Sequence, residues 1–528
     1  MISRLISALS PHWAYKRAVA RRALAQLDQR SYEGGKLHRL FKSWRANRES
    51  ADSAVLGELQ RTRWRAWDLY RNNPYVRKIV RTIIAQTIGT GILPEPQAVR
   101  PDGTPYDEFR LLSKQLWSRW CKRASFRGSP GAGGRTWYEL QQIQLKSTIL
   151  NGESLLRFRT ISDLSAIPLA IELISAERLS EELFSTSQLP NGHEIYRGIE
   201  FDAQDRRVAY WLYQKHPSTQ RLTMQNLKSV PIPAEEILHL YIQDDEEAER
   251  GTCWLAPVIL ESRDIQNYKE NELVASAVSA CVALGYHLPQ GSTAFGTKLP
   301  EAWDTTDTNS NTLTAMEPGM LIPLGEGGHL EGFNPQRPNS QIEGFAQFLL
   351  RGVAGAIPGI KSSTLTGDYR ESSFSSERSA ENDAWREIEI LQDWLISNNC
   401  QPVYERWLDA AVEAGAFEGI VSAKEYNAQR ESLTPATWSG PTSKSINPKE
   451  DEEASALAIK NGTSSPYKES AMRGYDAREN LEELAAWVKQ ARSLGLPEEY
   501  ILGALGVKAP PEPPKLKIGE GNAAFDAA

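Results

Sequence analysis

Cysteine is scarce in this chain, and long apolar runs are missing from it. Among 528 residues there are four cysteines, far apart and without a Cys-x-x-Cys pair: Cys121, Cys253, Cys281 and Cys400. This spacing excludes a disulfide framework and a cysteine-based zinc site. The sequence contains no run of about 20 apolar residues, the length needed to cross a membrane. Charged residues also interrupt the N-terminal segment, where a secretory signal needs an apolar core. We therefore expect a reducing, cytoplasmic setting and no membrane partner.

The usual signatures of enzymes are also missing. The segment Gly291–Lys298 resembles a phosphate-binding loop, but its lysine does not directly follow the second glycine and no buried strand precedes it. The glycine cluster Gly131–Gly134 lacks the strand-to-helix context of a dinucleotide site. The seven histidines show no metal-binding spacing, and no Gly-x-Ser-x-Gly elbow occurs. We therefore expect no enzymatic activity, cofactor or metal, and interpret His239 as a core histidine with a satisfied hydrogen bond.

Charge is nearly balanced over the whole chain but not along it. The net charge of −7 predicts no general affinity for nucleic acid. Residues 1–48 nevertheless carry eleven Lys and Arg against two acids, and residues 61–81 carry seven more against Asp68. Acids concentrate later, in Asp244–Glu249 and Glu450–Glu453. This asymmetry predicts a basic surface in one place and an acidic one in another; the alternative is a solvated arginine-rich helix.

Helical patterns in the first 150 residues give way to strand patterns. Residues 1–90 predict helices with a break at Asn72-Asn73-Pro74, because proline disfavours a helical residue before it and fits a first helical turn. Two more helices are expected at Leu111–Cys121 and Trp137–Leu150, the second capped by Asn151-Gly152. The predicted strands are Glu153–Arg159, a hairpin of Ile195–Phe201 with Arg207–Tyr213, and Ile237–Ile242. Together these elements predict the α+β class.

A pair of long helices follows, separated by an insert. Residues 254–283 predict one helix, residues 285–338 are rich in Gly, Pro, Thr and Asn and predict short strands and loops, and residues 341–356 predict a returning helix. Such a helix pair buries little apolar surface alone. Repetition of the pair around a ring would supply the missing contacts.

The rest of the chain is predicted to be mainly helical. A polar, turn-rich segment at 358–373 precedes a long helix that begins near Ser375 or Ser376. Residues 441–494 predict a small helical module, and the tail from Pro510 is predicted to be disordered because of its proline and glycine content.

Short motifs in a fixed order give the chain a resemblance to a known family. Each motif is weak alone, but their succession is specific: Arg63-x-Arg65-x-x-Asp68-Leu-x-Arg71-Asn-Asn-Pro74, Ile88-Gly-Thr-Gly-Ile92, Asn151-Gly-Glu153, Ala176-Glu-Arg-Leu179, Gly198-Ile-Glu-Phe-Asp202, Arg250-Gly251, Trp254-Leu-Ala-Pro257, Leu365-Thr-Gly-Asp-Tyr369, Phe374-Ser-Ser376, Gln401-Pro-Val-Tyr404 and Trp438-Ser-Gly-Pro441. In this order the residues resemble the lambda family of tailed-phage portal proteins along nearly the whole chain. One departure is Gly359–Ser363, where the family has a valine- or proline-rich approach.

The resemblance implies an α+β portal fold that assembles as a ring, usually of twelve subunits, at one capsid vertex. Double-stranded DNA would enter through it during packaging and leave during infection. The implied division is a basic arm and most of the wing at 1–253, the first stem helix at 254–283, the clip at 284–340, the second stem helix at 341–357, the tunnel loop at 358–374, the long tunnel helix and return to the wing at 375–444, the crown at 445–509 and a disordered tail at 510–528.

Three groups of functional residues follow from the resemblance together with the charges. Transient DNA contact is expected of the tunnel loop, at Lys361, Ser362, Ser363, Thr364, Asp368, Tyr369 and Arg370. Acids of the first stem helix are expected either to line the lumen or to solvate an outer face: Glu261, Asp264, Glu270 and Glu272. Basic interface candidates, facing capsid protein, DNA or, as the favoured interpretation, acids of a neighbouring subunit, are Arg63, Arg65, Arg71, Arg77 and Arg81.

The implied partners are other copies of the chain and the machinery of a phage particle. Because no nucleotide site is visible, a separate terminase large subunit would drive translocation from the clip. The other implied partners are the major capsid and scaffold proteins and a head-completion or tail adaptor protein, in a virion assembled in the host bacterial cytoplasm. Two alternatives are a nuclease or ATPase of the packaging apparatus and a basic DNA-binding scaffold protein, but neither explains the paired long helices.

Overall fold

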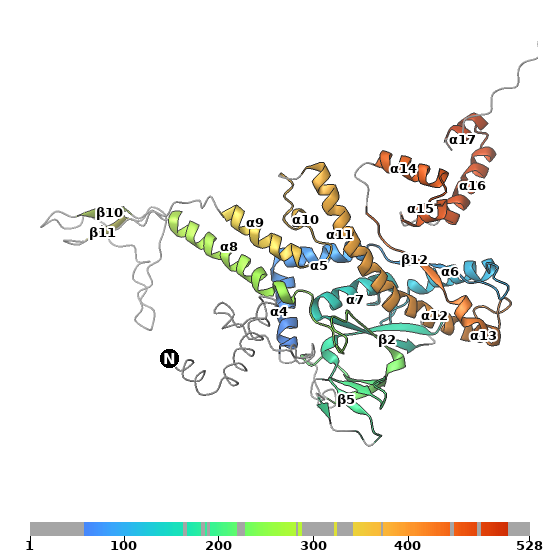
Figure 1. The fold of residues 1–528 in the computed structure, drawn as a ribbon, viewed down its shortest axis with the longest axis horizontal. Coiled ribbons are helices and arrows are strands. Elements are labelled where there is room, and N and C mark those ends of the chain that lie inside the picture. Colours follow the sequence, from blue (N-terminus) through green and yellow to red (C-terminus); the bar gives the residue numbers. More distant parts are fainter. Residues whose placement is uncertain are drawn as a thin grey trace, which may run out of the picture. The chain divides into compact units, whose positions relative to one another are not determined.

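The computed structural model describes residues 58–161, 166–180, 185–186, 189, 191–218, 228–280, 284–287, 321–324, 342–370, 373–443, 448–472 and 477–504. The predicted basic arm before residue 58, most of the predicted clip and the predicted disordered tail lie outside these residues. The chain divides into two compact units, Met1–Leu56 with Asp245–Glu249, and Gly57–Asp244 with Arg250–Ala528. All the helices and strands labelled in Figure 1 belong to the second unit.

Two consecutive helices open this unit. Helix α4 (Leu59–Asn72) and helix α5 (Pro74–Thr87) meet at Asn73, whose Oδ1 accepts hydrogen bonds from the backbone N–H groups of Tyr75 at 3.0 Å and Val76 at 3.1 Å. An asparagine cap followed by proline in the first turn begins a helix, because the cap satisfies free N–H groups and proline needs none. The predicted break at Asn73 is confirmed.

A three-stranded antiparallel sheet follows helix α7 (Trp137–Asn151). Its strand order is β3 (Leu169–Ile174), β2 (Glu153–Thr160) and β9 (Ile237–Tyr241). Gly152 caps α7 with a left-handed φ of 86°, as the sequence predicted, and turns the chain directly into the central strand. The first four residues of β2 are all buried: β9 pairs along all four, β3 pairs from Leu155 onward, and α7 packs against the strand.

A second, five-stranded antiparallel sheet has the order β4-β5-β6-β7-β8. Its strands are β4 (Ser185–Thr186), β5 (Glu194–Tyr196), β6 (Ile199–Phe201), β7 (Arg207–Tyr213) and β8 (Ser229–Pro233). The predicted hairpin is confirmed in β6 and β7, but the expected single strand Ile195–Phe201 is wrong. The chain turns at Arg197 and Gly198, where φ is 51° and 82°, so this stretch forms parts of two strands.

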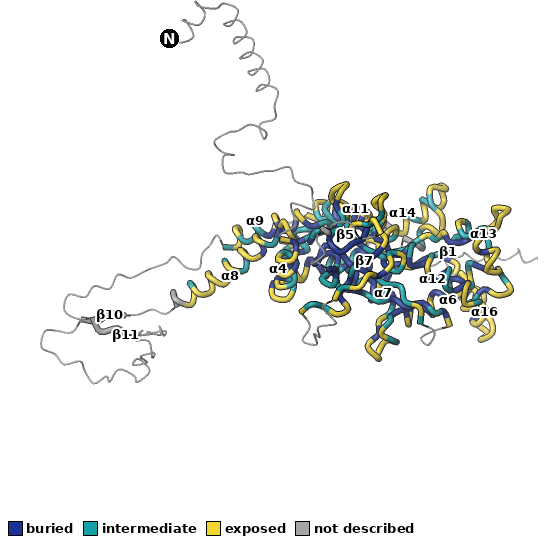
Figure 2. Tube along the Cα trace, turned by 90° about the horizontal axis from the view of Figure 1, so that it is seen from below, coloured by how far each residue is buried: buried dark blue, intermediate teal, exposed yellow. Residues whose placement is uncertain are grey.

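The predicted pair of long helices is present. Helix α8 (Ile259–Ala280) follows a 3-10 turn, and helix α9 (Ile342–Gly355) lies beside it (Figure 1). Both carry exposed residues along much of their length (Figure 2). Of the insert between them, the structure describes strands β10 (Leu284–His287) and β11 (Leu321–Leu324), which pair in parallel.

The segment after α9 is not the loop that the sequence predicted. A short helix, α10 (Ser362–Thr366), forms within it, and Ile357, Ile360 and Leu365 are buried. Polar composition suggested a loop, but these three apolar side chains anchor the segment in the core. Helix α11 (Phe374–Leu395) begins after Ser373, whose Oγ accepts the backbone N–H of Ser376 at 3.2 Å, slightly earlier than expected.

The remaining elements complete the unit. Helix α11 continues through the π-turn Ile396–Cys400 into α12 (Gln401–Glu413), followed by α13 (Ala423–Leu433). Strand β12 (Ala436–Ser439) pairs with β1 (Leu93–Pro96), near helix α6 (Asp107–Cys121). The predicted C-terminal module is helical as expected: α14 (Pro448–Lys460), α15 (Pro466–Met472), α16 (Ala477–Ser493) and α17 (Glu498–Ala504).

Two large apolar cores hold these elements. One joins α4, α5, α7 and α8 to α9, α10 and α11, and it includes Ile79, Ile83, Val353, Leu365 and Leu391. The other joins α6 and α7 to α12 and α13 around the indoles of Trp117, Trp120, Trp137 and Trp407. The first core fixes the segment 358–370 against α5 and α11, which positions the candidate functional residues.

Candidate functional site

Lys361 is the central charge of the segment between α9 and α11. Its Nζ donates to Glu377 Oε1 at 2.8 Å and to Glu381, both in the first turns of α11. Partial burial opposes the charge on Lys361, but these hydrogen bonds outweigh that effect and raise its pKa above the ordinary value. Ser363 Oγ also donates to Glu377 Oε1 at 2.8 Å. The lysine therefore ties the segment to the long helix.

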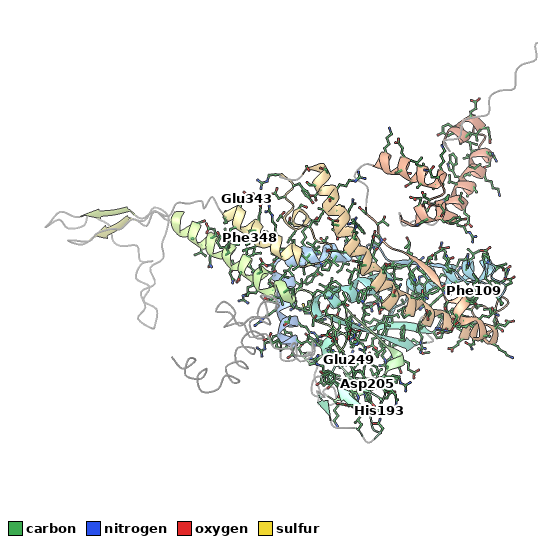
Figure 3. All side chains as sticks on the ribbon, in the orientation of Figure 1. Phe109, His193, Asp205, Glu249, Glu343 and Phe348 are labelled. Carbon is green, nitrogen blue, oxygen red and sulfur yellow. The ribbon has the colours of Figure 1, made fainter. Side chains whose placement is uncertain are left out.

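A second clamp holds the other end of the segment. Arg370 Nε donates to Asp368 Oδ1 at 2.9 Å, and its Nη2 contacts Asp368 Oδ2 at 2.7 Å and Glu343. Gln347 Nε2, also on α9, donates to Asp368 Oδ2 at 3.2 Å. Hydrogen bonds from Arg370 lower the pKa of Asp368 to about 2, so this carboxylate stays ionised. Glu343 and the exposed Phe348 both lie on α9 (Figure 3).

The structure thus brings the predicted tunnel-loop residues together on one short segment but engages several of them internally. Lys361 and Arg370 are its two cations, and both face carboxylates of the same chain. Tyr369 is 53% exposed, whereas Ser362 and Thr364 are half-buried. The Arg370 side chain is itself 71% exposed, so the segment presents Tyr369 and an arginine that is already paired with Asp368 to its surroundings, whereas Lys361 is largely covered.

The four acids of α8 do not form one row. Glu261 is half-buried against Gly352 of α9, where an added Cβ would lie 2.7 Å from Glu261 Oε1. Glu270 follows it by about two and a half helical turns and therefore lies on the opposite side of α8. Asp264 and Glu270 are exposed, and Glu272 is half-buried. Asp264 and Glu272 lie on the same side of α8 as Glu261, within about 80° of one another around the helix, so three of the four acids share one side and Glu270 does not.

The basic candidates on α4 and α5 divide into one buried and four exposed residues. Arg65, Arg71, Arg77 and Arg81 are exposed, as an interface role requires. Arg63 is fully buried, and its selection as an interface residue is wrong. Every third or fourth position of α4 faces the core, and Arg63 stands in that series between Leu59 and Ala66.

Arg63 belongs to a buried charge cluster that the sequence reasoning missed. Its Nη2 donates to Glu153 Oε1 at 2.8 Å, and its Nε donates to the backbone carbonyl of Asn151 at 2.7 Å. Arg250 Nε donates to both carboxylate oxygens of Glu153, at 2.8 and 2.9 Å. His239 Nε2 lies 3.0 Å from Glu153 Oε2. The interpretation of His239 as a satisfied core histidine is confirmed.

The protonation of this cluster follows from its burial and its charges. Burial disfavours the ionised form of Glu153, but Arg250 and Arg63 outweigh burial and hold its pKa well below the usual range. Burial lowers the pKa of His239 despite its hydrogen bond to Glu153. A neutral His239 therefore donates its Nε2 proton to a charged Glu153.

Two glycines allow the cluster to form. An added Cβ at Gly152 would lie 2.4 Å from the Gly251 carbonyl oxygen, and one at Gly251 would lie 2.1 Å from the Gly152 oxygen. Only glycine permits such an approach, which places Glu153 directly opposite Arg250. The signal was present in the motifs Asn151-Gly-Glu153 and Arg250-Gly251, which lie far apart in the sequence and meet in the fold.

Comparison with known proteins explains why these motifs occur together. A family model described as phage portal protein, lambda family, matches residues 37–392, more than half of the chain. The chain belongs to this portal family. The resemblance inferred from the motifs and the α+β class are both confirmed.

Individual portal proteins are similar over most of their length. The chain is 24% identical over 480 residues to the probable portal protein of Halomonas phage phiHAP-1, covering 89% of this chain and 88% of that protein. It is 20% identical over 492 residues to portal protein B of Escherichia phage lambda, covering 88% and 89%. A neck structure of an empty gene transfer agent particle covers 82% of this chain and 96% of its own, with 13% identity and a TM-score of 0.39.

Metal-binding groups and membrane-spanning helices are both absent from the described part of the portal chain. Within the ranges given above, no group of three or more His, Cys, Asp or Glu side chains is placed to hold a metal ion. None of the helices that the structure describes is both long and apolar enough to span a membrane. Cys121, Cys253 and Cys400 are buried free thiols, and burial raises the pKa of Cys253 to about 11.

Proposed function

We propose that this portal protein assembles as a ring, of twelve subunits as in the resemblance, at one vertex of a phage capsid, and that double-stranded DNA passes through its central channel during packaging and ejection. The observation that carries the proposal is the state of the segment 358–370. Both of its cations, Lys361 and Arg370, are held by carboxylates of the same chain. A segment neutralised in this way suits a wall past which DNA slides.

A channel wall must contact the DNA duplex without binding it tightly. Each phosphate that a lysine or arginine neutralises releases counterions and adds affinity, which would oppose sliding of the duplex. Carboxylates that already neutralise Lys361 and Arg370 reduce this affinity, and Asp368 remains charged at physiological pH. Tyr369 and the nearby hydroxyl groups of Ser362, Ser363 and Thr364 would then make the brief contacts that keep the duplex centred.

The other parts of the chain take roles from the same proposal. The sheets and the helices around them would form the wing, α8 and α9 the stem, residues 284–340 the clip, α11 the tunnel helix and α14–α17 the crown. A terminase large subunit would dock at the clip and supply the energy of translocation. Capsid and scaffold proteins and a head-completion or tail adaptor protein would contact other faces of the ring in the virion. The chain itself would have a structural role and catalyse no reaction.

The experiment is electron imaging of the purified full chain, with mass photometry for subunit number and assays for ATP hydrolysis and metal-dependent DNA cleavage. Closed rings with a channel wide enough for duplex DNA, and no turnover above that of a buffer control, are expected. A compact dimer with ATPase or nuclease activity would overturn the proposal and favour an enzyme of the packaging apparatus.

A further inference from the structure

Helix α5 carries an exposed row of positive charge. Arg77, Lys78 and Arg81 lie on the side of the helix opposite to its buried residues, and Arg71 at the end of α4 is exposed as well. Arg77 stacks over the ring of Tyr70, with its guanidinium carbon 5.9 Å from the ring centroid. In the part of the chain that the structure describes, none of these cations forms an ion pair with a carboxylate.

Helix α11 carries a pair of exposed carboxylates that span one helical turn, as Arg77 and Arg81 do on α5. Glu389 and Asp393 are one turn apart on its solvent side and flank the exposed Ile390, which is 71% accessible. The neighbouring cation Arg386 is paired with Asp383 at 3.1 Å. Among the described residues, neither Glu389 nor Asp393 has a cationic partner.

The two charged sets belong to helices that share one core. Buried residues of α5 and α11 lie in the same apolar cluster, and Gln392 Nε2 of α11 donates to the backbone carbonyls of Gln86 and Thr87 at 3.3 and 3.1 Å. The cations and the acids therefore lie on helix sides turned away from that core. Within the described part of one subunit, no ion pair joins the two sets.

We propose that the basic row of α5, Arg77, Lys78 and Arg81, docks against Glu389 and Asp393 on α11 of a second copy of this chain. The proposal rests on the ring assembly proposed above and assigns one of its contacts. Two different patches of opposite sign on one subunit satisfy each other head to tail, and such a heterologous contact closes into a ring when its rotation permits. Opposite charges also set the orientation in which the subunits meet.

A second copy of the chain complements the charge of both patches, whereas duplex DNA and residues 1–48 do not. Duplex DNA would neutralise the basic row but would leave Glu389 and Asp393 without a partner and repel them. Residues 1–48 of the same chain carry eleven Lys and Arg, so their charge opposes docking on the basic row. A second copy satisfies both patches in one contact.

Charge reversal tests the pairing in the full-length chain. One variant carries Glu389→Lys with Asp393→Lys, and another carries Arg77→Glu with Arg81→Glu. Each alone should raise the concentration needed for half-assembly by about tenfold or more, because it places like charges across the interface. Glu482→Lys with Glu483→Lys, at exposed positions of α16, is the control for the first variant, with the same change in charge, and should assemble normally.

Mixing the two defective variants gives the decisive result. In a head-to-tail ring, reversed acids of one variant meet reversed bases of the other, so the mixture should assemble as alternating rings by mass photometry although neither variant does so alone. A chain carrying all four reversals should also assemble. Rings that are unaffected by the reversals, or a mixture that stays dispersed, would overturn the pairing while leaving the channel proposal standing.

Two other results would overturn the pairing, and the second would overturn the proposed function as well. Reversal of Arg77 and Arg81 that leaves rings intact but lowers retention of duplex DNA would overturn the pairing and assign the basic row to nucleic acid. Failure of the unmodified chain to form rings under any condition that supports its fold would overturn both this inference and the proposed function.

Discussion

At the residue scale, one buried carboxylate, that of Glu153, holds several elements of the fold together. Glu153 joins Arg63 of α4, Arg250 before α8 and His239 of β9, and all four side chains are buried. A buried ion pair adds little net stability compared with apolar packing, but removal of one partner leaves the others charged and unsolvated. The cluster therefore specifies how α4, the three-stranded sheet and the segment before α8 meet.

Glu153→Gln should destabilise the chain by about 3–5 kcal/mol, because Arg63 and Arg250 would remain buried without a counter-charge. Urea unfolding, followed by tryptophan fluorescence, measures the loss. The control is Glu236→Gln, which breaks the more exposed pair with Arg157 at 2.8 Å and should cost about 1 kcal/mol or less. Equal effects from both variants would contradict the role of burial.

Stability should also fall as the pH drops below about 6.5, the ordinary pKa of histidine. Folding lowers the pKa of His239, so just below pH 6.5 this histidine is protonated in the unfolded chain but still neutral in the folded chain. The free energy of unfolding therefore decreases as the pH falls. Unfolding curves at about pH 7.5 and about pH 5.5 should differ more for the unmodified chain than for His239→Gln. Glu153 adds a second loss at lower pH, below its unfolded pKa, because its folded pKa is depressed.

Gly152→Ala should be more damaging than its backbone angle alone explains. Gly152 and Gly192 have similar left-handed φ angles, 86° and 81°, but a Cβ at Gly192 would meet nothing within 4 Å, whereas one at Gly152 would meet the Gly251 backbone at 2.4 Å. Gly192→Ala therefore measures the cost of the angle, about 1 kcal/mol. Thermal unfolding of both variants isolates the close approach, and equal losses would contradict it.

At the scale of elements, the segment 358–370 is a clamped connection between two helices. Its apolar residues pack into the core, and Lys361 and Gly359 are bound to α11, the latter through its N–H to Glu387 Oε2 at 2.6 Å. Lys361→Gln should leave overall stability within about 1 kcal/mol, since the carboxylates it would leave unpaired, Glu377 and Glu381, are 21% and 27% exposed and water can solvate them. Amide hydrogen exchange across the segment should nevertheless become faster.

The matched control for that variant is Lys449→Gln, which removes an exposed lysine 3.9 Å from Glu453 on α14. It should leave exchange across 358–370 unchanged. Exchange that is equally slow in Lys361→Gln and in the unmodified chain would show that apolar packing alone fixes the segment, and that the two carboxylates of α11 are not needed to hold it.

The sequence predicted elements better than contacts. Helix starts at Asn73 and ends at Gly152 were predictable because caps act locally. The helix α10 and the division of Ile195–Phe201 were not, since they depend on burial of Leu365 and on a turn at Gly198 packed against Ser180. Arg63 was misplaced because its partner, Glu153, lies ninety residues away along the chain.

At the scale of the whole molecule, family membership and charge placement support the same account. The chain belongs to the lambda family of phage portal proteins. Its basic and acidic helix faces are not satisfied within the described part of one subunit, whereas the cations of the segment 358–370 are. The account therefore places unsatisfied charge between subunits and neutralised charge along the path of DNA.

The most direct test of this account is a cryo-electron structure of the assembled full-length chain. The account predicts a closed ring in which residues 358–370 face the central channel, with Lys361 still bound to Glu377 and Glu381. A ring that turns this segment to its outer surface, or that lines the channel with unpaired lysine and arginine side chains, would contradict it.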